Sequence, residues 1–374
     1  LRQGIMSVLV VSALLGLVSL AVSPFLPTWL GGNSHITPTA SAYFAIVATA
    51  LPIFQFSIFG AGMLRSSGNM VVPSVMSVVM MSLDVVFNFF LIFPTRPMEL
   101  FGTQIMMPGM GMGVMGAAIG TVSAELVAAS MTMYILCFRS KELSLRIDTG
   151  RFLPTWGVVK RALHISLPMG LQQTIMCSAY VMTTIIIAPL GTFAIAANSF
   201  GIIIESLCYM PGYGIADAAT TLVGQSMGAG RHELMKRFAW LSVGLGVTVM
   251  AVMGVVMYVG APVAMAMMTP AEEVRRLGVE VLRIEAFAEP MFAAAIVSYG
   301  VFVGAAKTLV PSIMNLISIW GVRISLAAML APSMGLRGVW IAMCIELCFR
   351  GLIFLVKLKF WNIQTSCKHY GKDQ

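Results

Sequence analysis

The chain consists mainly of long apolar stretches separated by short polar connections. Each stretch is close to the ~20 residues that a helix needs to cross the hydrocarbon core of a bilayer. The apolar residues are continuous and do not alternate with polar ones, which is typical of spanning helices and not of membrane barrel strands. The pattern therefore predicts ten spanning helices, at about 5–28, 39–64, 73–93, 112–138, 160–188, 194–228, 238–268, 280–305, 309–331 and 336–360.

The second half of the chain repeats part of the first half at a spacing of 238 residues. The segment 72–77 (VPSVMS) returns at 310–315 (VPSIMN), and 21 residues before the proline of each copy lies another proline, Pro52 or Pro290. Internal repeats are common in transporters, whose binding sites lie at the interface between the repeats. The repeat therefore predicts a duplicated membrane bundle.

The repeat is unequal at its start. Shifted back by 238 positions, residues 164–238 fall before the first residue, so the helices at 160–188 and 194–228 have no counterpart in the first half. The chain also opens on leucine and not on methionine. We therefore expect that about 75 residues, or two helices, are missing at the N-terminus. A naturally asymmetric protein is the alternative.

Composition supports a membrane protein. Hydrophobic residues make up 58% and charged residues 10% of the chain, with a mean hydropathy of +0.90. A soluble domain carries about 25% charged residues, so this chain has too little polar surface for water. Of the 23 Lys and Arg residues, sixteen fall at the chain ends or in loops that share one side of the membrane. Because cytoplasmic loops are rich in Lys and Arg, both ends of the chain are predicted to be cytoplasmic. The net charge of +8 is explained by this distribution of basic loops, so it does not indicate a nucleic-acid partner.

The fold class predicted from these patterns is an all-α integral membrane protein with two homologous helical bundles, or lobes, and about ten transmembrane helices of an expected twelve. Residues 1–138 would form a truncated N-lobe with four of these helices, and residues 162–360 a C-lobe with six. The hydrophilic segment 139–161 would be a cytoplasmic linker between the lobes, and 361–374 a cytoplasmic tail. Residues 94–111 would form a long external loop.

One segment carries a family resemblance. Residues 207–237 read LCYMPGYGIADAATTLVGQSMGAGRHELMKR, and they follow LGT at 190–192 and AIAAN at 194–198. This order of motifs resembles the multidrug and toxic compound extrusion (MATE) family of secondary transporters, with this chain as the third to twelfth helices. Small residues let helices approach closely in a membrane, and the last glycines would end the helix before a basic loop. The motif residues expected to be structural are Pro211, Gly212, Gly224, Gln225, Gly228 and Gly230.

The resemblance implies a secondary active multidrug efflux transporter and not an enzyme. Such a protein would antiport lipophilic or cationic compounds against H⁺ or Na⁺ by alternating access between two lobes, with no cofactor and no bound metal. It would act as a monomer in the bacterial cytoplasmic (inner) membrane. Its partners would be the lipid bilayer and small lipophilic or cationic substrates.

Ionisable residues inside spanning helices are costly, so each one is a candidate for function. Glu205 and Glu289 are the leading pair, because they fall at comparable depth in the outer half of the C-lobe and Glu289 precedes a proline that can kink its helix. Two desolvated carboxylates near each other would suit the exchange of protons or Na⁺. The alternative is that a backbone group or a hydroxyl holds each carboxylate for structural reasons.

Further candidates lie elsewhere in the predicted spans. Asp84 and Asn88 are one turn apart on one helix of the N-lobe, where the resembled family usually has an Asp. Glu346 and Arg350 have the i,i+4 spacing of a structural ion pair, which Arg323 would join. The remaining candidates for transport or cation coupling are Asn198, Gln172, Gln173 and Asp217.

Two cation sites of the resembled family are not carried over to this chain. The cation-linked Asp on the family's first helix lies outside the sequence. Gln172 and Gln173 occupy the region where some members carry a Glu on the seventh helix, so the Na⁺ site of those members is in doubt here.

Other interpretations remain open. A flippase for a lipid-linked saccharide would share the two-lobe architecture, but it would favour a wide cavity lined by Arg and Lys, and only Arg323 and Arg350 lie in the spans. The chain as given would be a non-transporting fragment if the loss of two helices exposes interior faces of the first lobe. A membrane-embedded enzyme or an ATP-driven pump is not favoured, because the sequence holds no HExxH and no GxxxxGK[ST] motif.

Overall fold

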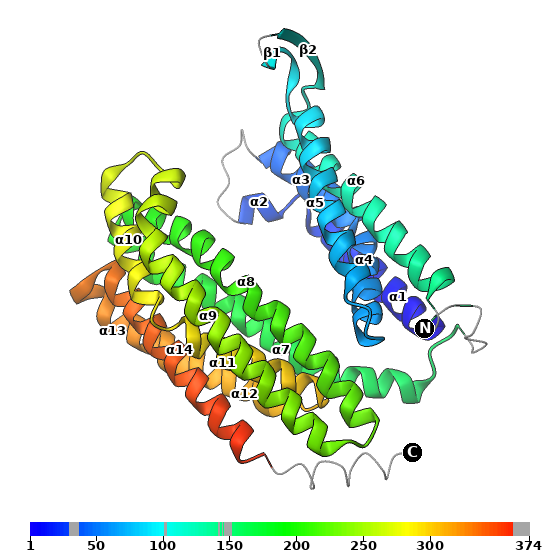
Figure 1. Cartoon of the computed structure of the whole chain (residues 1–374). Coiled ribbons are helices and arrows are strands. Elements are labelled where there is room, and N and C mark those ends of the chain that lie inside the picture. Colours follow the sequence, from blue (N-terminus) through cyan, green and yellow to red (C-terminus); the bar gives the residue numbers. More distant parts are fainter. Residues whose placement is uncertain (30–36, 101–102, 141–142, 144, 146–151, 362–374) are drawn as a thin grey trace. The chain divides into compact units, whose positions relative to one another are not determined.

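The computed structural model describes the whole chain except residues 30–36, 101–102, 141–142, 144, 146–151 and 362–374. The chain divides into two compact units, Leu1–Val159 and Lys160–Gln374 (Figure 1). Part of the predicted linker and nearly all of the predicted tail lie outside the described residues.

The first unit is a small helical bundle with one hairpin. Its helix α5 packs along α6, and α6 also contacts α3 and α4. A single π-helical turn follows α6 at Ile135–Arg139. The elements are α1 (Arg2–Val22), α2 (Leu26–Trp29), α3 (Thr37–Thr49), α4 (Leu51–Ser66), α5 (Val71–Ile92), β1 (Pro94–Leu100), β2 (Thr103–Met110) and α6 (Gly113–Tyr134).

The second unit is a larger helical bundle in which α11 packs against α8, α9 and α14. A 3₁₀ turn at Ala188–Leu190 follows its first helix, and a π-helical segment at Ile317–Ile324 joins α12 to α13. The helices are α7 (Trp156–Ile187), α8 (Thr192–Gly228), α9 (His232–Met268), α10 (Glu272–Glu285), α11 (Glu289–Gly304), α12 (Leu309–Leu316), α13 (Ser325–Met334) and α14 (Leu336–Lys359).

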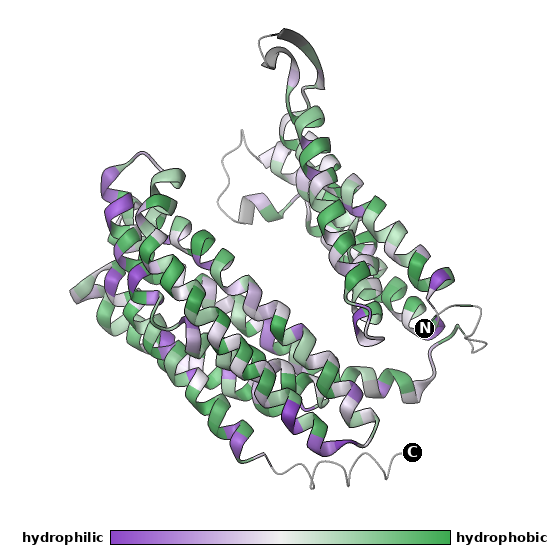
Figure 2. Cartoon of the chain, in the orientation of Figure 1, coloured by the Kyte–Doolittle hydropathy of each residue, from purple (hydrophilic) through white to green (hydrophobic). Residues whose placement is uncertain are grey.

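The helices confirm the predicted class of fold. Among the described residues, eight helices are long and apolar enough to cross a membrane, or up to ten if each of two bent pairs is one span. Large apolar side chains such as Leu17, Val85 and Val259 are exposed, whereas many buried positions of the second unit hold Gly, Ala or polar residues. Hydrophilic residues gather near helix ends (Figure 2). Apolar side chains on the outer surface are what contact with the lipid tails of a bilayer requires.

Two predicted spans are broken where a proline begins the second part. The axes of α3 and α4 differ by 45°, with Pro52 in the first turn of α4, and the axes of α10 and α11 differ by 59°, with Pro290 in the first turn of α11. Proline is well placed in the first turn, because it lacks the N–H that would otherwise go unused there. Pro168 and Pro211 instead lie within the continuous helices α7 and α8.

The segment 94–111, predicted as a plain loop, contains an antiparallel hairpin of β1 and β2. Its strands lie outside the apolar stretches, and apolar and polar residues alternate there over too few positions to predict a strand from the sequence. The hairpin therefore adds a two-stranded element to a fold that is otherwise helical.

Glycines set the spacing between α8 and α11. A Cβ added at Gly300 would lie 2.6 Å from the Ala216 carbonyl oxygen, and the Thr220 hydroxyl donates a 2.8 Å hydrogen bond to the Gly300 carbonyl. Gly224 faces the Gly304 carbonyl in the same way, with a 3.3 Å approach. Such close backbone contact is how small residues hold membrane helices together.

Other motif residues have different surroundings. Gly212 packs against the Met250 side chain, and Pro211 precedes it inside α8. α8 ends at Gly228, as the sequence predicts, and Gly230 follows with a φ of +69° that favours glycine. Gln225 is exposed on the last turns of the same helix.

Candidate functional site

The second unit buries four glutamates, each on a different helix: Glu205 on α8, Glu285 on α10, Glu289 on α11 and Glu346 on α14. Each residue is at most 7% exposed. An ionised carboxylate is costly in such a place unless a cation or several hydrogen bonds compensate its charge. The partners of each glutamate therefore decide what it can do.

Glu346 has a full set of partners. The Arg323 guanidinium donates two hydrogen bonds to Oε2, of 2.8 Å from Nη2 and 3.1 Å from Nε, and the Ser318 hydroxyl donates one of 2.6 Å to Oε1. Arg350 Nε lies 3.1 Å from Oε1. The Arg350 guanidinium also lies over the Phe292 ring, 5.4 Å from its centroid. The predicted ion pair of Glu346 with Arg350, joined by Arg323, is confirmed.

Glu285 and Glu289 have the opposite environment. They flank the 59° bend between α10 and α11, and both residues are 1% exposed. All four of their carboxylate oxygens are buried without a hydrogen-bond partner in the described part of the chain. Gly254 of α9 packs against Glu289, since a Cβ added there would lie 3.3 Å from the Glu289 Cβ. Glu205 is within electrostatic range of both carboxyls.

A small cavity of ≈40 Å³ lies beside Glu205. Three aromatic rings, two polar side chains and a guanidinium contribute to its wall: Tyr180, Tyr209, Trp340, Thr183, Asn198 and Arg323. A buried water occupies at least roughly 10–15 Å³ by this measure. The cavity therefore has room for about three waters or a small ion, and not for a drug-sized molecule.

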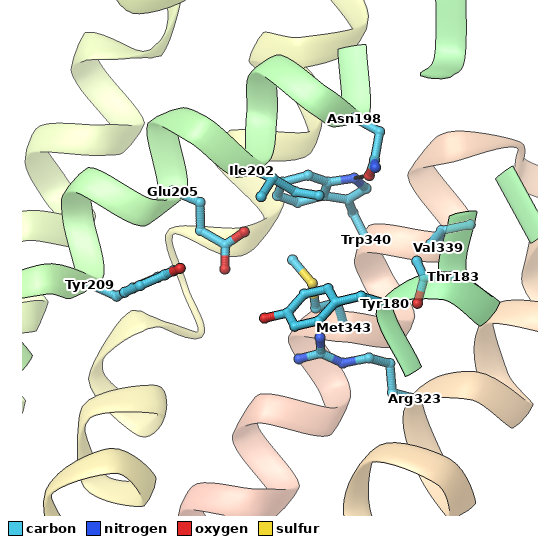
Figure 3. Close-up of a pocket in the computed structure, with 10 residues that line it drawn as sticks. All are labelled: Tyr180, Thr183, Asn198, Ile202, Glu205, Tyr209, Arg323, Val339, Trp340 and Met343. Atoms are coloured by element: carbon cyan, nitrogen blue, oxygen red, sulfur yellow. Dashed lines mark hydrogen bonds between the residues drawn. The ribbon is translucent and has the colours of Figure 1, made fainter. Parts of the chain in front are cut away.

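Figure 3 shows how the side chains of this cavity are directed. The Glu205 carboxylate points into the space between Tyr209 and Tyr180, and the Arg323 guanidinium lies on the far side of the Tyr180 ring. At the rim, Trp340 Nε1 donates a 3.1 Å hydrogen bond to Asn198 Oδ1. The cavity thus combines one acidic group with aromatic faces, which attract cations electrostatically.

The other C-lobe candidates lie apart from the four glutamates. Gln172 accepts a 2.7 Å hydrogen bond from the Ser312 hydroxyl, which ties α7 to α12. Gln173 is exposed one residue further along α7, and Asp217 is exposed on α8. The structure therefore brings Glu205 and Asn198 to one cavity, and it places Gln172 in a contact between helices.

Asp84 and Asn88 belong to the first unit. They lie one turn apart on α5, and the Oδ1 atom of each is buried without a hydrogen-bond partner among the described residues. A Cβ added at Gly120 would lie 3.2 Å from the backbone nitrogen of Asn88, so α6 passes close to this turn. The pair is a polar position within an apolar bundle, as the sequence predicts.

Sequence reasoning did not single out several residues of this region. Glu285 is a candidate by default, as an ionisable residue of a predicted span, but it is not part of the leading pair. Its i,i+4 spacing with Glu289 was the signal that could have joined it to that pair. Tyr180, Tyr209 and Trp340 gave no local signal, because they come from three helices far apart in the sequence.

A serine-nucleophile motif is also present by spacing alone. Residues 224–228 (GQSMG) match the Gly-x-Ser-x-Gly pattern, but they lie within α8, and Ser226 is buried. A nucleophile elbow needs a sharp strand-to-helix turn that exposes the serine. Within the described ranges, no group of three or more His, Cys, Asp or Glu side chains is arranged to hold a metal ion.

Comparisons with known proteins agree with this architecture. The family model MatE matches residues 1–90 and 168–329. A probable multidrug resistance protein NorM of Thermotoga maritima is 26% identical over 329 residues, which are 87% of this chain and 67% of that protein. A protein of the same name from Xylella fastidiosa is 29% identical over 245 residues, which are 64% of this chain and 52% of the relative. The matches thus span between half and about two thirds of these relatives.

Solved structures share the fold at low sequence identity. A multidrug resistance MATE family transporter of the MOP superfamily, in an outward-facing conformation, is 19% identical with a TM-score of 0.86, covering 95% of this chain and 76% of the other. A structure of MATE in the straight conformation has the same identity and TM-score, covering 97% of this chain and 78% of the other.

Proposed function

Because this chain belongs to the MatE family, we propose that it is a secondary active multidrug efflux transporter that antiports lipophilic or cationic compounds against H⁺ or Na⁺. Its family match spans parts of both units, and the relatives named above are multidrug resistance proteins. The substrates would cross the membrane by alternating access between the two lobes, as in other transporters built from repeats.

The observation that carries this proposal is the uneven compensation of buried charge in the second unit. Two guanidiniums, those of Arg323 and Arg350, surround Glu346, whereas Glu285 and Glu289 have no such partner among the described residues. A mobile cation would supply the missing positive charge. Binding of a proton or Na⁺ there would make the charge of this region depend on the ion gradient, which is what an antiporter requires.

Competition for the same negative charge would couple the binding of substrate to the binding of the ion. A cationic substrate approaching Glu205 and the rings of Tyr180 and Trp340 would lower the affinity of the nearby carboxylates for their cation. Because such coupling is reciprocal, the cation would in turn weaken substrate binding. The cavity of ≈40 Å³ is too small for the substrate, so the proposal also requires a more open conformation.

The test is ethidium efflux from proteoliposomes with an imposed H⁺ or Na⁺ gradient. The Glu205→Gln variant removes the charge at nearly constant size, and Glu272→Gln, at an exposed position in the first turn of α10, is the matched control. The proposal expects gradient-driven efflux by the parent chain and the control, and its loss in Glu205→Gln. Efflux unchanged in Glu205→Gln would make Glu205 structural and overturn the assignment.

Absence of efflux under both gradients would favour one of the two alternatives. Ethidium binding by the purified chain separates them, because a non-transporting fragment with an intact site still binds ethidium. A flippase would instead move a lipid-linked saccharide in the same vesicles. We do not favour the flippase, because Arg323, whose guanidinium is the one that the described residues contribute to the cavity, is already paired with Glu346.

A further inference from the structure

A groove of ≈360 Å³ opens on the surface of the second unit between α9, α10 and α14. This volume lies at the low end of the range of about 300–1,000 Å³ that is common for ligand clefts. Its wall is apolar except at one point, where a single basic side chain joins it. The wall includes Tyr258, Phe287, Ile341, Cys344, Ile345 and Arg283.

Arg283 is held at the groove by two contacts with Tyr258. Its Nε donates a 3.4 Å hydrogen bond to the Tyr258 carbonyl, and its guanidinium lies over the Tyr258 ring, 5.1 Å from the centroid. The Phe287 ring meets the same tyrosine edge to face at 5.7 Å. These contacts place the guanidinium at the groove and leave its terminal nitrogens available to another acceptor.

The part of the chain that the structure describes supplies no counter-ion for this charge. Among the described residues, no carboxylate lies within ion-pair distance of Arg283, and Glu280, one turn earlier on α10, is paired with Arg337 at 2.6 Å. Phe287 is 71% and Ile345 46% exposed, so the groove lies on an apolar surface. A bare positive charge on such a surface is costly in a bilayer and calls for an anionic partner.

The position along the helices sets the depth of Arg283. α9 has 37 residues and so is ~55 Å long at 1.5 Å per residue, about 25 Å more than the hydrocarbon core. Tyr258 lies ten residues before the end of α9 at Met268, or ~15 Å from it. If the excess length is shared between the two ends, Tyr258 and Arg283 lie near the boundary between hydrocarbon and headgroups.

We propose that this groove binds an anionic phospholipid in the leaflet that meets the turn between α9 and α10. The phosphate would accept hydrogen bonds from the terminal nitrogens of Arg283, and part of one acyl chain would lie along Phe287 and Ile345. A guanidinium suits a phosphate, because it can donate two parallel charge-assisted hydrogen bonds to the phosphate oxygens. The apolar wall provides a binding surface for the acyl chain of such a lipid, which a soluble anion would not contact.

The simpler alternative is that Arg283 extends to the aqueous interface and binds no particular lipid. Long basic side chains near helix ends commonly do this. The two accounts differ in one measurable respect. A lipid site selects the anionic headgroup and depends on Arg283, whereas an extended side chain does neither.

Native mass spectrometry of the purified, delipidated chain tests the proposal. Dioleoylphosphatidylglycerol or dioleoylphosphatidylcholine is added in detergent, and the fraction of protein carrying one lipid is measured. The parent chain should bind the anionic lipid more tightly than the zwitterionic one. Arg283→Gln should weaken binding of the anionic lipid about fivefold, the scale expected for one basic residue near an anionic surface.

Arg276→Gln is the matched control, because Arg276 is an equally charged and exposed residue of α10 outside the groove wall. It should leave lipid binding unchanged, and Phe287→Ala should weaken both lipids by removing apolar wall. Each variant is first checked for a single folded species by size-exclusion chromatography. Equal binding of the two lipids by the parent chain, or equal loss in Arg283→Gln and Arg276→Gln, would overturn the proposal. Neither readout depends on transport, so the lipid site stands or falls separately from the efflux proposal.

Discussion

Two regions of the second unit bury the same side chain in contrasting ways. Glu346 is 0% exposed and is surrounded by Arg323, Arg350 and the Ser318 hydroxyl. Glu285 and Glu289 are each 1% exposed, yet their oxygens have no hydrogen-bond partner in the described part of the chain. Burial alone therefore does not separate a structural carboxylate from a functional one.

The difference lies in what neutralises the charge. Arg323 and Ser318 fix the π-helical segment Ile317–Ile324 to α14 through Glu346, and Arg350 adds a second charge from α14 itself. A fixed partner of this kind leaves no place for an exchanging ion. At the bend between α10 and α11 the described residues supply no such partner, so we interpret a cation from solution as the source of positive charge there. We interpret the first region as structural and the second as the place where an ion is exchanged.

The largest effect is expected when the compensated region is broken. Glu346→Gln would leave two buried guanidiniums without their anion, and breaking a buried ion pair in this way costs roughly 3–5 kcal/mol. Chemical unfolding in detergent, followed by tryptophan fluorescence, measures the loss. Glu280→Gln is the control, because its pair with Arg337 is half exposed and contributes about 0–1 kcal/mol. An equal, small loss in both variants would show that Glu346 does not stabilise the bundle.

The second prediction sharpens the same comparison at the uncompensated region. Glu289→Gln removes a buried charge that has no described partner, so stability should be unchanged or higher. Gradient-driven efflux should fall roughly 5- to 150-fold, the range typical of a lost coupling free energy. The same unfolding and efflux assays give both quantities. Destabilisation as large as in Glu346→Gln would reveal a structural role for Glu289 and remove the contrast.

The smallest effect is expected at the rim of the cavity beside Glu205. Asn198→Ala removes the acceptor of the Trp340 Nε1 hydrogen bond, which should cost about 0.5–1.5 kcal/mol because water in the cavity can replace the amide. Efflux should keep its dependence on the gradient, since no carboxylate is altered. If efflux by this variant no longer depended on the gradient, the cavity wall, and not the charge of the glutamates, would couple substrate transport to the ion.

Much of the fold could be predicted from the sequence, because a bilayer imposes length and hydropathy on every span. The ion pair of Glu346 and Arg350 was also predictable, since both residues lie on one helix face. The two bends could be predicted only in part. Pro52 and Pro290 mark their positions, but the angles of 45° and 59° depend on packing with other helices. The hairpin at 94–111 was missed, because its pattern is short.

The repeat also sets a limit on what sequence can predict. Gly62 and Gly300 align at the spacing of 238 residues, yet Gly300 packs against α8 while no described atom lies within 4 Å of a Cβ added at Gly62. Likewise, the lack of a hydrogen-bond partner for Glu285 among the described residues is a property of three-dimensional packing, which neither its spacing nor its helix could indicate.

The most direct test of the central claim is to measure cation release when substrate binds. Isothermal titration of ethidium into the purified chain, in buffers that differ in ionisation enthalpy and with or without NaCl, reports the protons or Na⁺ displaced. We predict release by the parent chain and by Glu280→Gln, and none by the combined variant Glu205→Gln, Glu285→Gln, Glu289→Gln. The same release from the combined variant and the parent chain would contradict the claim that these glutamates hold the exchanging ion.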